Sequence, residues 1–205
     1  VSSNNFASGA QDEITLSSGT KSVIGGAGAD TINACGGRNI VMGDEGQAEF
    51  FTNGSVRSIE SINLGTGEDD QITLSAGNNS VIAGAGADTI VVGNGTNTVL
   101  GDEGRLEVLS ETTVIESMNA AVGGADIISI GSGKNVVIGG AGSDKITVNG
   151  TASDAQATVL GDNGRLTLGN DGVLLNATSN NFASGALDEI TLTSGTNTVI
   201  GGAGA

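Results

Sequence analysis

The sequence predicts an all-β fold: a parallel β-roll or β-solenoid with two short strands in each turn of roughly 18 residues. Two observations lead to this prediction. The 205 residues include 36 Gly and no Pro, and aromatic residues make up only 2%, which suits a thin core filled by Val, Ile and Leu. Apolar residues recur every nine residues, and no segment keeps the period of an amphipathic helix.

Long repeats organise the chain. The segment Ser3–Ala29 returns almost unchanged as Ser179–Ala205, and the tetrapeptide GD[EN]G begins at Gly43, Gly101 and Gly161. Self-similarity at a fixed period is the signature of a stacked repeat protein. We therefore expect one continuous solenoid over residues 1–205, with modules at 7–64, 65–120 and 121–182 and a shortened module at 183–205.

Each nine-residue unit, or nonad, reads as a turn followed by a short strand with one inward Ile or Val. Counting every nonad, including those that begin with GD[EN]G, predicts three turns in each complete module. The whole chain would then form about ten and a half turns and a rod roughly 50 Å long. The segment Gly164–Leu175 contains an Asn-Asp-Gly sequence and is either a small hairpin or a longer turn of the solenoid. The expected core positions are Ile14, Val23, Ile32, Val41, Ile72, Val81, Ile90, Val99, Ile128, Val137, Ile146, Ile190 and Val199.

The most regular nonads share the pattern GGxGxDxUx, in which U is a large apolar residue. Residues 25–33 (GGAGADTIN) and 139–147 (GGAGSDKIT) fit every defined position, and residues 83–91 (AGAGADTIV) depart only at the first Gly. This repeated pattern resembles the RTX, or hemolysin-type, calcium-binding repeats. The resemblance implies a β-roll that binds Ca²⁺ between stacked turns. It also implies export by type I secretion in an unfolded state, followed by folding in external calcium.

The resemblance further implies that aspartates along one edge of the roll are calcium ligands. Ca²⁺ takes about six to eight oxygens, and a Gly-rich turn can add backbone carbonyls to those of the carboxylates. The expected pairs are Asp12 with Asp30, Asp70 with Asp88, and Asp126 with Asp144, and Asp188 begins another pair. The glycines expected in these loops are Gly26, Gly28, Gly84, Gly86, Gly140 and Gly142. Further candidates, from a different loop position, are Asp44, Asp102 and Asp162 of the GD[EN]G turns.

The opposite edge carries different residues at the same position of the nonad. Lys21 would repel a cation there, and the other turns have Asn39, Asn79, Asn97, Asn135 and Asn197. We expect this edge to be free of metal and held by stacked Asn and Thr hydrogen bonds. The competing interpretation for the aspartates is that they only cap turns, as Asp often does.

An apolar line is a candidate for self-association. Every second nonad ends in an apolar residue directly after an inward one, and alternation along a strand points it outward. A continuous exposed apolar line usually marks an interface, so rods could pack side by side or against the inserted segments. The alternative is that the following turn directs these side chains into the core. The candidate interface residues are Ile24, Met42, Leu64, Ile82, Leu100, Ile138, Leu160, Phe182 and Ile200.

Composition limits the classes of function. The net charge is -16, with Lys+Arg 7 against Asp+Glu 23, which disfavours nucleic acid and anionic membranes as partners. No apolar run is long enough to span a membrane. The chain has no His, no Ser-His-Asp set and no phosphate loop, so we expect no enzymatic activity. Cys35 can form no intrachain disulfide, and we expect it to be a small core residue.

These features favour a calcium-stiffened structural segment of a secreted or cell-surface protein: an extracellular fibre, matrix protein or large adhesin. One alternative is a secretion and folding module of a larger toxin or hydrolase. Long, nearly identical repeats favour the fibre, because a carrier module needs only a few turns. A minor alternative is ice binding through Thr20, Thr96, Thr196 and the asparagine row.

Overall fold

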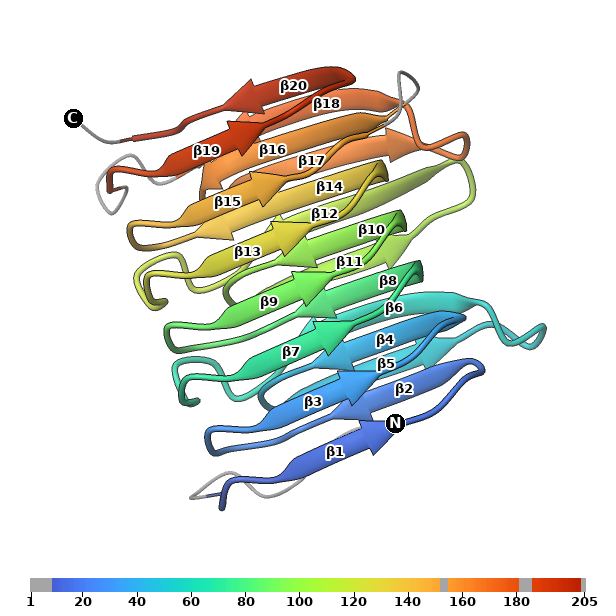
Figure 1. Cartoon of the computed structure of the whole chain (residues 1–205), viewed down its shortest axis with the longest axis vertical. Helices are drawn as coiled ribbons and strands as arrows, with labels where there is room; N and C mark the ends of the chain where they lie inside the picture. The colour runs from blue at the N-terminus through green and yellow to red at the C-terminus, as the bar shows by residue number, and fades with distance from the viewer. Residues whose placement is uncertain (1–8, 152–154, 181–185, 204–205) are drawn as a thin grey trace.

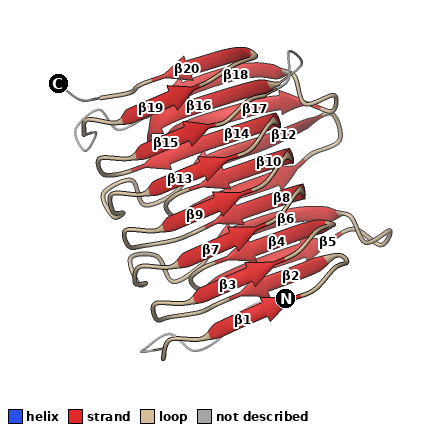
Figure 2. Ribbon diagram, viewed as in Figure 1, coloured by secondary structure: helices blue, strands red, loops and turns tan. Residues whose placement is uncertain are grey.

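The computed structural model describes residues 9–151, 155–180 and 186–203. These residues form 20 strands in three sheets, stacked along one axis so that the chain climbs from one end of the rod to the other (Figure 1). Figure 2 shows only strands and loops. The described residues contain no helix, and hence none long and apolar enough to cross a membrane. The all-β prediction is confirmed.

Two seven-stranded parallel sheets face each other and make the roll. The first roll sheet contains β1 (Glu13–Leu16), β3 (Thr31–Ala34), β7 (Gln71–Leu74), β9 (Thr89–Val92), β13 (Ile127–Ile130), β15 (Lys145–Val148) and β19 (Glu189–Leu192). The second roll sheet contains β2 (Lys21–Ile24), β4 (Arg38–Met42), β8 (Gly77–Ile82), β10 (Gly95–Leu100), β14 (Gly133–Gly140), β16 (Gln156–Asp162) and β20 (Thr196–Ile200). The chain alternates between them, so each turn contributes one strand to each sheet, as predicted.

The third sheet is antiparallel, and the nonad count did not predict it. Each GD[EN]G turn opens a β-hairpin that leaves the roll, and neighbouring hairpins pair in register through β6–β11 and β12–β17. The question about Gly164–Leu175 is thereby settled in favour of a hairpin, closed by the hydrogen bond from Gly169 N–H to the Val173 carbonyl. This hairpin sheet contains, in spatial order, β18 (Leu174–Ser179), β17 (Gly164–Gly169), β12 (Thr112–Ser117), β11 (Gly104–Val108), β6 (Val56–Ser61) and β5 (Gly46–Phe50).

The expectation of three solenoid turns per module is therefore wrong. The described residues make two roll turns for every hairpin, and each roll sheet has seven strands. With a strand spacing of about 4.8 Å, seven strands span roughly 29 Å, not the expected 50 Å.

The core of the roll lies between the two parallel sheets, as the sequence predicts. The inward Ile and Val residues stack in columns because equivalent positions pair in register from strand to strand. Those at the ends of the rod, including Ile14 and Ile190, are only partly buried, and Val199 is exposed. Cys35 is exposed, and Ala34 takes the core position expected for it. The fully buried members of this core are Ile32, Val41, Ile72, Val81, Ile90, Val99, Ile128, Val137, Ile146 and Val159.

A second core lies between the second roll sheet and the hairpin sheet, and it corrects the predicted interface. Met42, Ile82, Leu100, Ile138 and Leu160 are at most 2% exposed, because the hairpins of the same chain cover them. Ile24 and Ile200 pack against the same cluster and are partly buried. Leu64 is 40% exposed in a loop, and Phe182 lies outside the described residues. The apolar line is thus an internal packing surface, and it is not available for joining two rods. The hairpin residues that cover it are Ala48, Ile59, Leu106, Ile115, Leu166 and Leu168.

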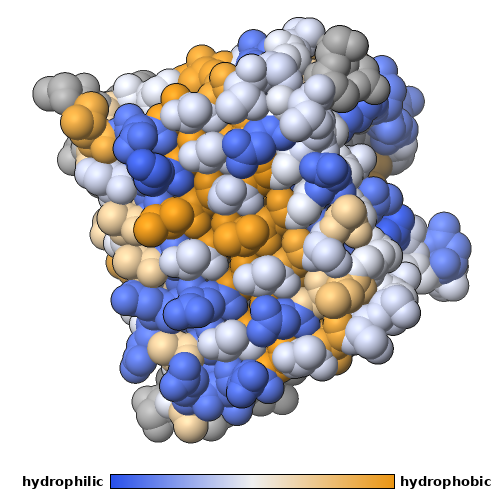
Figure 3. Space-filling view, viewed as in Figure 1, coloured by the Kyte–Doolittle hydropathy of each residue, from blue (hydrophilic) through white to orange (hydrophobic). Residues whose placement is uncertain are grey.

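Among the described residues, no further sheet covers the outer face of the first roll sheet. Figure 3 looks onto this face, where pale and apolar side chains mix along the middle of the rod. Val91 and Ile127 are its exposed large apolar residues. Most of the asparagine row considered for ice binding is not available to water, because Asn39, Asn79 and Asn97 are at most 1% exposed, although Asn197 is exposed.

Candidate metal centre

The chain turns between the two roll sheets at two edges of the rod. We call the edge where it passes from the second roll sheet to the first the aspartate edge, and the other the asparagine edge. At the aspartate edge, plain loops at 25–30, 83–88 and 139–144 alternate with loops at 43–70, 101–126 and 161–188 that contain a hairpin. Each hairpin is therefore an insertion within an edge loop, and the chain returns to the same edge after it (Figure 1).

A ladder of hydrogen bonds links the aspartates of this edge. In each turn the backbone N–H of one Asp donates to Oδ1 of the Asp in the next turn. The N···O distances lie between 2.7 and 3.0 Å. The ladder crosses module boundaries without interruption, since Asp30 donates to Asp70 just as Asp70 donates to Asp88. Its members in spatial order are Asp12, Asp30, Asp70, Asp88, Asp126, Asp144 and Asp188.

The second carboxylate oxygen of each inner aspartate is buried without a partner. Oδ2 has no hydrogen-bond donor in five successive members, Asp30, Asp70, Asp88, Asp126 and Asp144, although each of these residues is only 1% exposed. Buried polar atoms are normally paired, and an unpaired buried carboxylate oxygen carries a large desolvation cost. A row of such oxygens requires a positive partner, and no side chain among the described residues supplies it.

Backbone carbonyls gather around these free oxygens. At Gly25, the space that a Cβ would fill is bounded by Oδ2 of Asp30 and by the carbonyl oxygen of Gly43 in the next turn. The same arrangement of one Oδ2 and one carbonyl from the following turn recurs at Gly43, Gly101, Gly139 and Gly161. Glycine leaves this space open, so hard oxygen donors of two turns converge on one place, which is the donor set that Ca²⁺ prefers.

Burial and mutual repulsion raise the pKa values of these carboxyl groups. Burial is the largest cause, and it raises the pKa of Asp70 to about 8 and that of Asp126 to about 10. The charges of neighbouring aspartates, Asp88 and Asp30 for Asp70 and Asp102 and Asp88 for Asp126, raise the values further. The carboxylates of Asp70 and Asp126 would thus each need a cation nearby to stay ionised at neutral pH. Burial also raises the pKa values of Asp30, Asp88, Asp144 and Asp188.

The aspartates of the GD[EN]G turns lie at the same edge but make different contacts. Oδ2 of Asp44 accepts a 2.6 Å hydrogen bond from the backbone N–H of Ala85 in the next loop. Oδ2 of Asp102 accepts one from Ala141 in the same way, and its Oδ1 accepts one from Gly124. Oδ2 of Asp162 accepts one from Ala203 and its Oδ1 one from Ala186. These side chains therefore clip each hairpin-bearing loop to the loop that follows it.

The glycines expected at the sites shape the plain loops. All six have φ between 107° and 130°, a left-handed region that other residues rarely adopt. This conformation lets two carbonyls of one short loop point toward the same edge. The residues concerned are Gly26, Gly28, Gly84, Gly86, Gly140 and Gly142.

The asparagine edge has a ladder of its own, in which Asn79 and Asn97 each donate two side-chain hydrogen bonds. Asn39 Nδ2 donates to Asn79 Oδ1, Asn79 to Asn97, and Asn97 to Asn135, at 2.7 to 2.9 Å. The expected stacking of Asn side chains is confirmed for these four. Ala157 occupies the next register position and ends the series, and Asn197 beyond it is exposed.

Side chains alone do not complete a metal site at the aspartate edge. Within the described ranges, no three Asp, Glu, His or Cys side chains cluster closely enough to hold a metal ion. Any ion there would rely on backbone carbonyls together with one or two carboxylates. The donors found here, carboxylate and peptide oxygens on flexible loops, fit Ca²⁺ and are poor ligands for softer metals.

The comparison with protein families agrees with this donor set. The family model for the RTX calcium-binding nonapeptide repeat matches the chain in four copies, over residues 22–47, 64–104 and 121–150. The chain contains RTX calcium-binding repeats across residues 22–150. RTX nonapeptide repeats bind Ca²⁺, so Ca²⁺ is the ion of this repeat, and the family is structural and not catalytic. No curated protein and no solved structure matches the chain.

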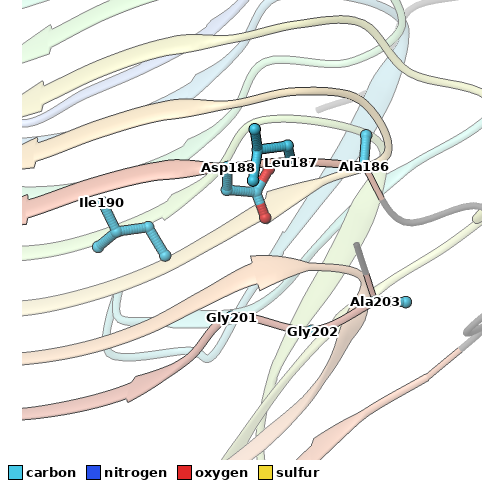
Figure 4. A pocket seen from close by; sticks show the side chains of 7 residues that line it. All are labelled: Ala186, Leu187, Asp188, Ile190, Gly201, Gly202 and Ala203. Atoms are coloured by element: carbon cyan, nitrogen blue, oxygen red, sulfur yellow. The ribbon is translucent and has the colours of Figure 1, made fainter. Parts of the chain in front are cut away.

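The RTX loops of this chain bring together most of the predicted residues. The ladder unites the three expected Asp pairs in one series, so each inner Asp has a neighbour on both sides. Asp12 is exposed at one end of it. At the other end, Asp188 points its carboxylate toward Gly201 and Gly202 of the next loop (Figure 4). Sequence reasoning missed the carbonyl donors at Gly43 and Gly161, which the GD[EN]G motif itself could have revealed, because its first Gly aligns with that of GGxGxD.

Proposed function

We propose that this chain is a calcium-stiffened segment of an extracellular fibre, matrix protein or large adhesin. In this role Ca²⁺ ions occupy the aspartate edge and join successive turns into one rod. The observation that carries the proposal is the row of five buried, unpartnered Oδ2 atoms, four of which lie beside a backbone carbonyl of the next turn. A structural role also agrees with the secretion of RTX proteins to the outside of the cell, where millimolar calcium is available.

The proposed ligands are the ladder aspartates together with the carbonyls of the glycine loops. Each cation would lie between two adjacent turns and bond oxygens from both, which ties binding to the stacking of strands. Because binding requires the folded roll, calcium affinity and folding free energy are linked. The aspartates of the GD[EN]G turns would act mainly by holding the hairpin-bearing loop against its neighbour, since amide N–H groups already use oxygens of Asp44, Asp102 and Asp162.

Continuity along the rod supports the fibre role over a purely carrier role. Three hydrogen-bonded features cross the module boundaries: the aspartate ladder, the asparagine ladder and the pairing of adjacent hairpins. A chain built this way transmits force from one module to the next without a flexible linker. The second candidate is a secretion and folding module of a larger toxin or hydrolase. Such a module needs calcium-coupled folding, but it does not need hydrogen bonding that continues from module to module.

A calcium titration followed by circular dichroism tests the calcium part of the proposal. The chain in chelator at neutral pH should show a weak β signal, and calcium should restore it with a saturable midpoint that chelator reverses. A full β signal in excess chelator would mean that the aspartates only cap turns and that folding does not require calcium.

Small-angle scattering on tandem copies of the chain tests the fibre part. A fibre segment should give a cross-section independent of copy number and a length that rises in proportion to it when calcium is present. Tandem copies that behave as beads on flexible joints, although each binds calcium, would favour the carrier role.

A further inference from the structure

The ammonium group of Lys21 is surrounded by oxygens at the asparagine edge. Lys21 Nζ lies 2.9 Å from the Gly19 carbonyl oxygen, 2.7 Å from that of Cys35 and 2.9 Å from that of Gly36. A fourth oxygen, Oδ1 of Asn39, lies at 3.1 Å. A lysine ammonium has three N–H bonds, so four oxygens at these distances surround it as ligands surround an ion.

In the turns that follow, the backbone carbonyl equivalent to that of Cys35 has a different hydrogen-bond partner. Cys35 stands four residues before Asn39, and its carbonyl bonds Lys21. In the next three turns, the ladder Asn bonds the carbonyl four residues before itself, from Asn79 to Ser75, Asn97 to Gly93 and Asn135 to Gly131. Each turn of this edge thus presents a carbonyl that needs a positive or donating partner, and in one turn that partner is a full positive charge.

The backbone is arranged in the same way at the two edges. At the asparagine edge, the carbonyls of Gly19, Gly37 and Gly77 stack against the glycine of the following turn, as carbonyls do at the aspartate edge. The difference lies in the side chain. An aspartate leaves a free anionic oxygen, an asparagine supplies neutral N–H donors, and a lysine supplies a cation.

We propose that the oxygens around Lys21 form a second kind of cation site, whose resident cation is the chain's own ammonium group. All four oxygens are neutral, so the site suits a singly charged ion of ammonium or potassium size and not Ca²⁺, which prefers carboxylates. Removing the side chain opens the site to such an ion from solution. Lys21 thereby holds its turn of the asparagine edge together without calcium.

Chemical rescue of Lys21→Ala tests this site. The thermal midpoint is measured by circular dichroism in saturating calcium, at constant ionic strength, in ammonium, potassium or tetramethylammonium chloride. In tetramethylammonium, which is too large to enter, Lys21→Ala should melt about 4–8 °C below the parent chain. Ammonium or potassium should restore at least half of that loss. Lys134→Ala is the matched control, because Lys134 lies near the start of a strand of the same sheet but is exposed with a single 3.4 Å contact.

Two further variants keep the test decisive. Lys21→Met fills the same space without charge, so its loss should resist rescue by every salt. Lys21→Asp adds a carboxylate to the four oxygens and should raise the number of bound Ca²⁺ ions, counted by calorimetry, by one. If Lys21→Ala fails to fold, refolding yield in ammonium against tetramethylammonium replaces the midpoint. A Lys21→Ala chain that matches Lys134→Ala, or a loss that no small cation reverses, would overturn the proposal while leaving the calcium role of the other edge intact.

Discussion

The backbone N–H of Asp30 donates a 2.7 Å hydrogen bond to Oδ1 of Asp70, although forty residues and a complete hairpin separate them in sequence. This bond places the plain loop at residues 25–30 directly against the hairpin-bearing loop at residues 43–70. Because Oδ2 of both residues stays buried and unpartnered, the contact also brings two anionic oxygens to the same edge. Without cations, this contact and the equivalent contacts along the ladder would hold adjacent buried carboxylates without a compensating charge.

Replacing Asp88 with Asn should have opposite effects with and without calcium. An Asn retains Oδ1 as the acceptor for the N–H of Asp70 but replaces a buried charge with an amide. The calcium-free chain should become more stable, whereas the calcium midpoint should rise roughly tenfold because a charged ligand is lost. Circular dichroism titrations with and without chelator measure both. A turn-capping role alone predicts no shift of the calcium midpoint.

The calcium-free fold should be most stable in acid. The folded pKa values of Asp88, Asp70 and Asp126 are raised to about 7, 8 and 10 from an unfolded value of 3.8, so the folded chain holds protons that the unfolded chain releases. The free energy of unfolding should therefore be highest below pH about 4 and fall as the pH rises through the folded values. Urea unfolding in chelator at several pH values checks this.

Calcium binding at neutral pH should accordingly release protons. Calorimetry in two buffers of different ionisation enthalpy counts them. A calcium-free chain that gains stability with rising pH, or binding that releases no protons, would contradict this account of the edge.

Truncating Ile115 to Ala should destabilise the calcium-bound chain by about 2–4 kcal/mol. Ile115 is fully buried between the hairpin sheet and the second roll sheet, so its loss leaves a cavity between two layers. Leu175→Ala on an outer strand, where Leu175 is 60% exposed, should change the free energy of unfolding by less than about 0.5 kcal/mol. Urea titrations in saturating calcium compare the two, and equal effects would mean that the hairpins do not pack as described.

Removing the Asn97 side chain should weaken the asparagine ladder without altering calcium binding. Asn97 accepts from Asn79, donates to Asn135 and bonds the Gly93 carbonyl, so Asn97→Ala leaves buried groups unpaired at a cost of about 1–3 kcal/mol. The number of calcium ions found by calorimetry should stay the same. Asn78→Ala, which alters an exposed neighbour, is the control, and a lower ion count in Asn97→Ala would show that both edges bind metal.

The sequence predicts the roll well because its signals are local and repeated. One inward Ile or Val per strand and one Asp per edge loop follow from the nonad pattern, and the buried residues Ile32 and Ile90 are where that pattern puts them. The stacking of Asn79 on Asn97 follows from the same period.

The nine-residue pattern does not identify the hairpins, because their strands also carry inward apolar residues. Ala48 and Ile59 could belong equally to a roll turn or to an antiparallel pair. The nine-residue count does not distinguish the two, although the Asn53–Gly54 sequence at the first hairpin tip is a turn signal that could have done so. For the same reason, the nine-residue pattern predicts that Met42 and Leu100 are exposed. The hairpin strands that bury them are not distinguished from roll strands by that pattern. The sequence predicts only that the charge of Lys21 repels metal, because its four oxygen neighbours depend on three-dimensional contacts between two turns.

The inserted hairpins also affect how the rod would resist bending. Each hairpin accompanies two roll turns, so one module adds only about 9.6 Å of length, while a third sheet thickens the rod on one side. Resistance to bending rises steeply with the depth of a cross-section, and this depth lies perpendicular to the sheets. A long array of such modules would be short for its mass, and the third sheet would stiffen it against bending across the sheets more than two sheets alone would. Its two broad faces would also present different chemistry.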